Sequence, residues 1–202
     1  MAMNHEFESH RKSAPQEIVP VEIKRFSDEA REALTKDGYV IYVLNGQSIR
    51  AHREAGKKFW STWHEDRRYA DFETQSSISS EVAINPDALF IPKSNRKKIS
   101  EQQNMIVKFS TDFGKKVKGV GAVMGNAADY VGLAFAHLDA TGERLFGEKY
   151  GYNWTRTKTP VEGLVVRVGR FDAGYGLHVR RCSPDSGVSY IFAAPLVVPK
   201  AA

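Results

Sequence analysis

The chain has 202 residues, of which 42% are hydrophobic and 26% charged, and its formal net charge at pH 7 is +5. A chain of this length and composition buries a core within one domain, and its longest apolar runs are far shorter than the ~20 residues of a membrane-spanning helix, which excludes an integral membrane protein. The single Cys182 excludes an internal disulfide and, with an N-terminal stretch that has no apolar signal core, leads us to expect a cytoplasmic protein.

The first elements are a polar arm, a short helix and a strand. Residues 1–22 lack hydrophobic periodicity and are expected to form a disordered N-terminal arm. Ser27 is a suitable N-cap for a helix with two acidic residues in its first turn, and Asp37-Gly38 is a typical end for it. The sequence of residues 39–44, YVIYVL, is apolar on both faces, which predicts a central strand.

An amphipathic helix is predicted over residues 48–64, with Ser48 as its N-cap. Its apolar stripe comprises Ile49, His52, Gly56, Phe59, Trp60 and Trp63. Arg50, Arg53 and Lys57 lie on an adjacent flank of this helix. Such a helix is compatible with an anion-binding surface, but any amphipathic surface helix has the same pattern.

The middle of the chain predicts a loop, two strands and a helix. Residues 65–80 have no convincing period and are expected to form a long loop, followed by short strands at 81–84 and 88–91. A capping box of Ser100 and Gln103 predicts the start of a helix that ends near Gly114. One face of this helix is apolar and consists of Met105, Ile106, Phe109 and Phe113.

The last third of the chain predicts an α+β arrangement. A small-residue strand is expected at 119–124, and the next segment, 127–140, has the alternation of a strand but the caps and alanine content of a helix, so we predict a helix. Three antiparallel strands are expected within 163–198, the last one interrupted by Pro195. The predicted fold is therefore a single α+β domain over 23–202, with a mixed sheet, a C-terminal antiparallel three-stranded meander and about four helices.

The first candidate site is a surface for RNA or single-stranded DNA. Residues 150–160, YGYNWTRTKTP, interleave three aromatic residues with cations, as a platform for stacked bases would. The members of this candidate platform are Tyr150, Tyr152, Trp154, Arg156 and Lys158. The alternative is that the aromatic rings pack on the sheet.

Phosphates would be bound by the most basic segment of the chain. Residues 93–118 carry 8 Lys/Arg against 2 Asp/Glu, a net charge of +6. This charge attracts phosphates or acidic partners, although a solvated helix with solubilising lysines has the same composition. The candidate phosphate ligands are Lys93, Arg96, Lys97 and Lys98.

A second candidate site follows from a predicted hairpin around residues 172–176. If Phe171 pairs with Leu177, Arg170 faces His178, and Arg180 lies two residues along on the same face of the sheet. Three cationic groups on one surface would bind a phosphate or a carboxylate. A register that differs by one residue would disperse the cluster.

No cofactor or metal site is expected from the sequence. Walker, zincin, paired-cysteine and nucleophile-elbow motifs are absent, and the glycines of 119–125 have the wrong spacing for a dinucleotide loop. His137 and Asp139 point apart on a helix, and Cys182 beside Arg181 has no identifiable base, so a structural thiol is preferred.

Three functions are compatible with these features. The first is a non-catalytic binding module for an anionic partner, foremost RNA or single-stranded DNA. The second is a small hydrolase or transferase for a phosphorylated substrate, with the Arg170, His178 and Arg180 cluster as anion clamp and a carboxylate such as Asp139 as base. The third is a structural subunit of a larger assembly. The sequence does not predict the oligomeric state.

Overall fold

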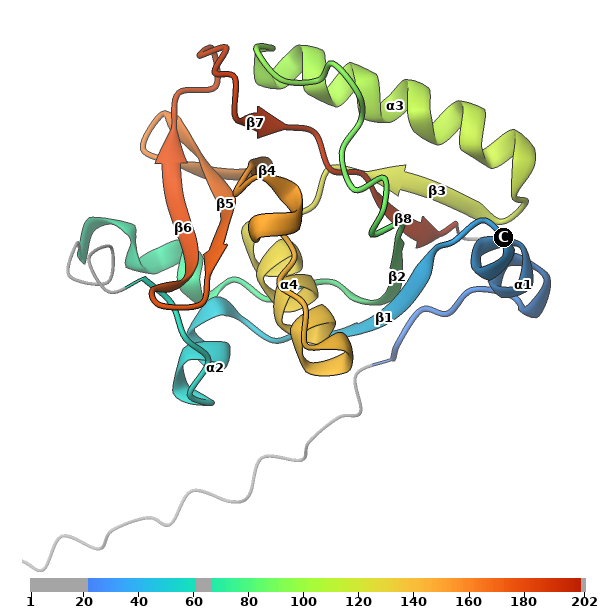
Figure 1. The fold of residues 1–202 in the computed structure, drawn as a ribbon, viewed down its shortest axis with the longest axis horizontal. Coiled ribbons are helices and arrows are strands. Elements are labelled where there is room, and N and C mark those ends of the chain that lie inside the picture. Colours follow the sequence, from blue (N-terminus) through green and yellow to red (C-terminus); the bar gives the residue numbers. More distant parts are fainter. Residues whose placement is uncertain (1–21, 61–66, 201–202) are drawn as a thin grey trace, which may run out of the picture.

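The computed structural model describes residues 22–60 and 67–200, so the predicted arm lies almost entirely outside the described residues. The chain forms an α+β fold with two four-stranded sheets, ordered β1-β2-β8-β3 and β6-β5-β4-β7 (Figure 1). The helices are α1 (Asp28–Lys36), α2 (Ile49–Glu54), α3 (Ile99–Lys116) and α4 (Ala127–Thr141), with 3-10 turns η2 (Arg67–Thr74) and η3 (Glu148–Tyr150). The strands are β1 (Val40–Asn45), β2 (Ser79–Ile84), β3 (Val120–Val123), β4 (Trp154–Val161), β5 (Leu164–Asp172), β6 (Gly176–Cys182), β7 (Ile191–Phe192) and β8 (Leu196–Pro199).

Helix α4 lies between the two sheets and contacts β1, β4 and β5. Most of its side chains are buried, including Val131, Leu133 and Phe135, because a helix enclosed by sheets has no solvent-facing stripe. The predicted helix is confirmed, and the strand-like alternation of this segment reflects burial on all sides. Asn126 caps the helix and Gly142 ends it, as predicted.

The first sheet is covered on both faces. Residues of β1 and β2 such as Leu44 and Val82 face α4, whereas Ala83 faces a second core formed with α1 and α3. The prediction that residues 39–44 form a central strand is wrong in position, because β1 lies at the edge of its sheet. Val40 and Val43 are accordingly 38% and 49% exposed.

Helix α2 is much shorter than the predicted helix of residues 48–64. It ends after Glu54, and Gly56 adopts a φ of +80°, the left-handed conformation that terminates helices. The amide N–H groups of Gly56 and Lys57 donate to the carbonyls of Arg53 and His52, which completes a Schellman motif. The chain then extends, and Phe59 forms a bridge with Leu177 of β6. Trp63 of the predicted stripe lies outside the described residues.

Two boundaries in the middle of the chain also differ from the prediction. Residues 88–91 form no strand, although Ile91 N–H donates to the Ala193 carbonyl. Helix α3 begins at Ile99, because Lys98 is its N-cap and Glu101 accepts from the Lys98 N–H at 2.8 Å, so the capping box lies two residues earlier than predicted. The helix also continues past Gly114 to Lys116.

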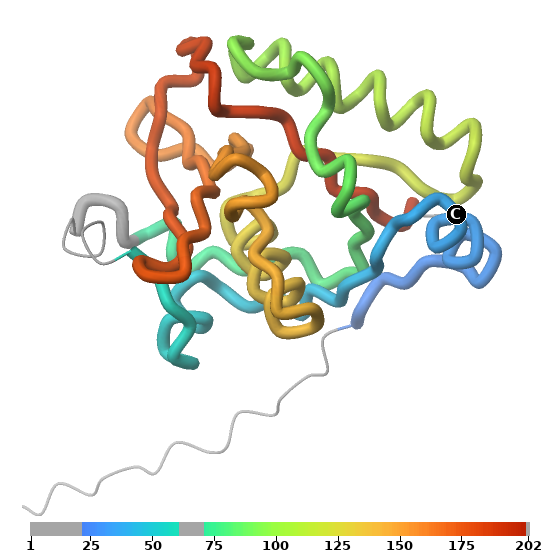
Figure 2. Tube along the Cα trace, viewed as in Figure 1, coloured from blue at the N-terminus to red at the C-terminus, as the bar shows by residue number. Residues whose placement is uncertain are grey.

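An antiparallel three-stranded meander is present, but it consists of β4-β5-β6, and the third strand predicted within 163–198 does not pair with β6. After β6 the chain divides between the sheets: β7 pairs with β4 in parallel and β8 pairs with β2 and β3. In Figure 2 the red C-terminal segment crosses from one sheet to the other. Pro195 lies at the break between β7 and β8, as predicted. No helix in the described part of the chain is long and apolar enough to cross a membrane.

Candidate functional site

A hollow of about 690 Å³ lies on the face of the meander that points away from α4. Its size is within the usual range of ligand pockets. Its lining consists of aromatic and cationic side chains: Trp60, Tyr152, Trp154, Arg167, Arg170, Tyr175, His178, Arg180 and Tyr190. We call this hollow the arginine–aromatic pocket.

Strand alternation separates the lining of the pocket from the core. Val166 and Val168 of β5 and Val179 of β6 face α4, so the intervening residues face outward. The registers of the meander place two rows across this outward face. One row is Arg156, Arg167 and Arg180, and the other is Trp154, Gly169 and His178.

Two of the three guanidinium groups of the pocket, those of Arg167 and Arg180, lie over aromatic rings. The Arg167 guanidinium carbon lies 4.4 Å from the Trp154 ring centroid, and that of Arg180 lies 3.8 Å from the Trp60 ring. Trp60 also stacks on His178, with centroids 4.8 Å apart and an interplanar angle of 4°. A stacked guanidinium is fixed in its plane while its N–H donors remain at the edge.

Among the described residues, no acidic side chain in the pocket lining neutralises the charge of these arginines. No carboxylate belongs to the lining formed by residues 22–60 and 67–200. The nearby Asp172 carboxylate accepts from the N–H groups of Gly174 and Tyr175 at 2.6 and 3.0 Å and thus serves the turn. Burial and the neighbouring Arg167 and Arg170 lower the pKa of Arg180, which indicates mutual repulsion of the cations.

Two buried nitrogens of the pocket have no hydrogen-bond partner in the described part of the chain, namely His178 Nε2 and Arg167 Nε. His178 is only 6% exposed, and its burial together with Arg170 and Arg180 lowers its pKa to about 4, so its imidazole is neutral at pH 7. Buried polar groups normally have partners. The unpaired Arg167 Nε–H, which is a donor in every protonation state, lies among other cations and therefore suits an oxygen-rich anion.

The predicted cluster of Arg170, His178 and Arg180 is present, although the register is not the predicted one. Gly169, not Arg170, pairs with His178, and the register shifts between Gly169 and Asp172. Arg170 adopts a φ of 48° at this irregularity. The resulting bulge keeps its side chain at the pocket, which a regular strand would not do.

The residues of the candidate platform, 150–160, do not form one surface, because they lie in different parts of the structure. Tyr152 and Trp154 line the arginine–aromatic pocket, but Trp154 is only 6% exposed and lies against Arg167. The Tyr150 ring packs against Phe90 in a separate hollow. Lys158 is exposed outside the pocket lining.

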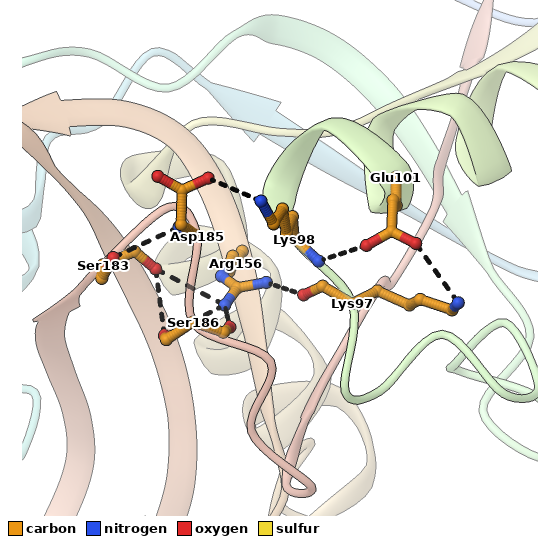
Figure 3. A network of polar contacts seen from close by, with 7 residues as sticks. All are labelled: Lys97, Lys98, Glu101, Arg156, Ser183, Asp185 and Ser186. Atoms are coloured by element: carbon orange, nitrogen blue, oxygen red, sulfur yellow. Dashed lines mark hydrogen bonds and ion pairs between the residues drawn. The ribbon is translucent and has the colours of Figure 1, made fainter.

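Arg156 is fully buried and holds protein backbone (Figure 3). Its Nη1 donates to the Lys97 carbonyl at 2.6 Å and to Gln102 Oε1 at 3.2 Å, and its Nη2 donates to the Ser186 carbonyl. Because this guanidinium donates its hydrogen bonds to protein acceptors, Arg156 stabilises the fold and is not a ligand-binding residue. Arg156 was predicted to bind nucleic acid because the sequence of residues 150–160 does not reveal that this side chain is buried.

The predicted phosphate ligands form a neighbouring surface. Lys93 and Arg96 are exposed, whereas Lys97 Nζ lies 3.2 Å from Glu101 and Lys98 Nζ lies 3.8 Å from Asp185. The latter two charges are therefore partly compensated. Arg96 packs against the loop of residues 183–190, because its N–H donates to the Val188 carbonyl at 3.0 Å.

Four residues of the pocket lining were not predicted as site residues. Trp60 was assigned to a core stripe, and Arg167, Tyr175 and Tyr190 were not assigned to any site. The alternation of 164–169 with apolar residues on one face was a signal for Arg167, because it predicts an outward-facing cation beside Arg180. No local signal indicated Trp60 or Tyr190, since both reach the pocket from distant segments.

The other residues considered for catalysis or metal binding lie outside the arginine–aromatic pocket. Asp139, the predicted base of a hydrolase, lies outside the pocket lining, and both its carboxylate oxygens lie 2.6 Å from Lys57 Nζ. His137 Nδ1 shares a hydrogen bond of 2.6 Å with the Tyr42 hydroxyl in the core. Among the described residues, no group of three or more His, Cys, Asp and Glu side chains could hold a metal ion.

Acidification is expected to destabilise the protein between pH 6.5 and pH 4. Burial lowers the pKa of His52, His137 and His178, so the unfolded chain binds protons that the folded chain does not bind. The free energy of unfolding should fall as the pH decreases through this window. Urea denaturation at a series of pH values would measure the slope, which should be smaller in His178→Gln. An unchanged slope in this variant would contradict the lowered pKa of His178.

No family model, no curated protein and no solved structure matches this chain. The arginine–aromatic pocket is thus the feature of this chain that bears on its function.

Proposed function

We propose that the protein is a non-catalytic binding module for RNA or single-stranded DNA. The observation that carries this proposal is the arginine–aromatic pocket, which Arg167, Arg170 and Arg180 line together with aromatic side chains and without a carboxylate among the described residues. Single-stranded nucleic acid offers both phosphates and ring faces, which such a pocket recognises together.

The tyrosines of the pocket supply accessible ring surface. Tyr175, Tyr190 and Tyr152 are 64%, 43% and 38% exposed, respectively. Stacking of a base on an aromatic side chain contributes about 1–3 kcal/mol and tolerates any base. Trp154 and Trp60 serve a different purpose in this proposal, since they hold the guanidinium groups of Arg167 and Arg180.

The basic surface at Lys93 and Arg96 provides a continuation for the bound strand. Asn95 Nδ2 donates to the Ser189 carbonyl at 2.9 Å, so this surface is attached to the loop that leads to Tyr190 in the pocket. A strand whose base stacks on Tyr190 would extend along this loop toward Arg96. Non-specific phosphate contacts there would add affinity that depends strongly on salt.

The hydrolase or transferase remains the second proposal, but the lining supports it less. General acid–base catalysis needs a group that carries a proton near the operating pH. The low pKa of His178 makes it a weak base, and Asp139 is paired with Lys57 outside the pocket. An assembly subunit, the third proposal, would bury the exposed tyrosines against another chain.

Fluorescence anisotropy with a labelled oligouridine and a labelled oligodeoxythymidine at several salt concentrations tests the binding proposal. The double variant Arg170→Gln/Arg180→Gln should weaken binding about tenfold or more and reduce the log–log salt slope by about 0.7 for each lost phosphate contact. Tyr175→Ala should weaken binding with little change in slope, because stacking releases few counterions.

The matched control removes two charges from exposed lysines outside the pocket. Lys24→Gln/Lys36→Gln, which lies outside the basic segment 93–118 as well, has the same change in net charge and should leave the affinity nearly unchanged. Equal losses in the pocket and control variants would indicate attraction by net charge alone. Absence of binding of the unaltered protein at low salt would overturn the proposal.

A further inference from the structure

We infer that the arginine–aromatic pocket recognises a terminal phosphomonoester, so that the protein prefers the phosphorylated end of a strand to its interior. This inference rests on the proposed function. The part of the nucleic acid that enters the pocket would be its terminal phosphate, which the cations of the pocket would bind.

The positive charge of the pocket favours a phosphomonoester over a phosphodiester. Three guanidinium groups, those of Arg167, Arg170 and Arg180, surround one hollow without a carboxylate in its described lining. Arg167 and Arg180 are moreover direct cross-strand partners, an arrangement that like charges disfavour. An internal phosphodiester carries one negative charge, whereas a phosphomonoester carries about 1.5–2 at neutral pH. The monoester therefore compensates the cluster better.

The number of available N–H donors in the pocket also favours a phosphomonoester. Cation–π stacking fixes Arg167 and Arg180 without using their N–H groups, and the only hydrogen bond given by either guanidinium to a described residue is that of Arg167 Nη1 to the Tyr190 hydroxyl, at 3.3 Å. The buried Arg167 Nε–H is likewise a donor without a partner among the described residues. A terminal phosphate presents three acceptor oxygens, and planar guanidinium forks match pairs of them.

The other basic surface contrasts with the pocket. Lys93 and Arg96 are exposed, and no ring lies over either of them among the described residues. Exposed cations that no described ring holds in place suit the single charges of an internal backbone. The rigid cluster and the exposed surface thus correspond to the end and the interior of one strand.

The test compares one oligonucleotide sequence in forms with a 5′-phosphate, a 3′-phosphate or hydroxyls at both ends, competing in the anisotropy assay against a labelled strand. One phosphorylated form should compete about tenfold or more better than the hydroxyl form. Which end is preferred distinguishes a 5′ from a 3′ specificity. The preference should decrease strongly in Arg180→Lys, which keeps the charge but removes the planar fork.

The control variant is Lys93→Gln/Arg96→Gln. It should weaken all three forms equally and preserve the preference, because its residues contact the interior of the strand. Thermal unfolding of each variant verifies that it is folded. Equal competition by all three forms would overturn the inference and leave the proposed function intact.

Two further competitors separate this inference from the proposed function. In a direct calorimetric titration, a nucleoside monophosphate that binds with the same Arg180→Lys sensitivity while no oligonucleotide binds would show that the proposed function fails and that the pocket still takes a phosphomonoester. If a phosphotyrosine peptide competes better than every oligonucleotide, the inference about strand ends is overturned. Failure of all phosphomonoesters to bind also overturns it.

Discussion

Arg156→Met is expected to lower the free energy of unfolding by about 3–5 kcal/mol, because removal of one member of a buried, charged hydrogen-bond network leaves the other members unpaired. Arg156 is 0% exposed, and its donors serve the carbonyls of Lys97 and Ser186 and the side chain of Gln102. Methionine retains the apolar length of the side chain but none of its donors. Urea denaturation followed by circular dichroism would measure the loss.

The network of Arg156 joins three segments that are distant in sequence (Figure 3). It connects β4 with the start of α3 and with the loop of residues 183–186. The matched control is Lys158→Met, two residues along the same strand and exposed, which should change the free energy of unfolding by no more than about 0.5 kcal/mol. A similarly small change in Arg156→Met would show that the guanidinium contributes no net stability.

Gly169→Ala is expected to destabilise the fold by about 1–3 kcal/mol or more and to abolish the pocket geometry. A Cβ atom at this position would lie 2.5 Å from Trp154 Cα and 2.6 Å from the Asn153 carbonyl oxygen, both of which are backbone atoms. Relief of this overlap requires β4 to move away from β5. Such a movement would separate the Trp154 ring from His178, whose centroids now lie 5.9 Å apart.

The control for this substitution is Gly174→Ala in the neighbouring turn. There the nearest atom to the added Cβ is a carboxylate oxygen of Asp172, at 3.1 Å, which needs to shift by only a few tenths of an ångström and so can keep its hydrogen bonds to the turn. Thermal unfolding and the oligonucleotide anisotropy assay would be applied to both variants. If Gly169→Ala kept both its melting temperature and its oligonucleotide affinity, the close approach of β4 and β5 would not be required for the pocket.

The helices that were predicted correctly are those whose ends are marked by capping residues, because a cap acts on backbone groups within one helical turn of itself. Ser27 and Asn126 cap α1 and α4, and Gly142 ends α4, because each of these residues satisfies or terminates the adjacent backbone hydrogen bonds. The apolar face of α3 was predicted for the same reason, since Ile106 and Phe113 share one side of a helix whatever covers it. The left-handed Gly56 was the signal that the sequence analysis misread as part of a stripe.

The candidate site was predictable only in part. The cationic character of the hairpin face followed from Arg170, His178 and Arg180, which lie close together in sequence. The bulge that keeps Arg170 at the pocket arises from pairing between β5 and β6, and a one-residue change in register is not visible in a single strand. The burial of Arg156 likewise depends on segments of residues 97–102 and 183–186 that cover it.

The sequence by itself thus determined the α+β class, the helices with clear caps, the β5-β6 hairpin and the basic character of its outward face. Only the tertiary structure decided that β1 is an edge strand, that Arg156 is a buried structural cation, and that Trp60 and Tyr190 complete the pocket. The physical reason is the range of the interactions concerned. Caps and periodicity act over a few residues, whereas sheet order, burial and the convergence of side chains depend on contacts between distant segments that no local pattern encodes.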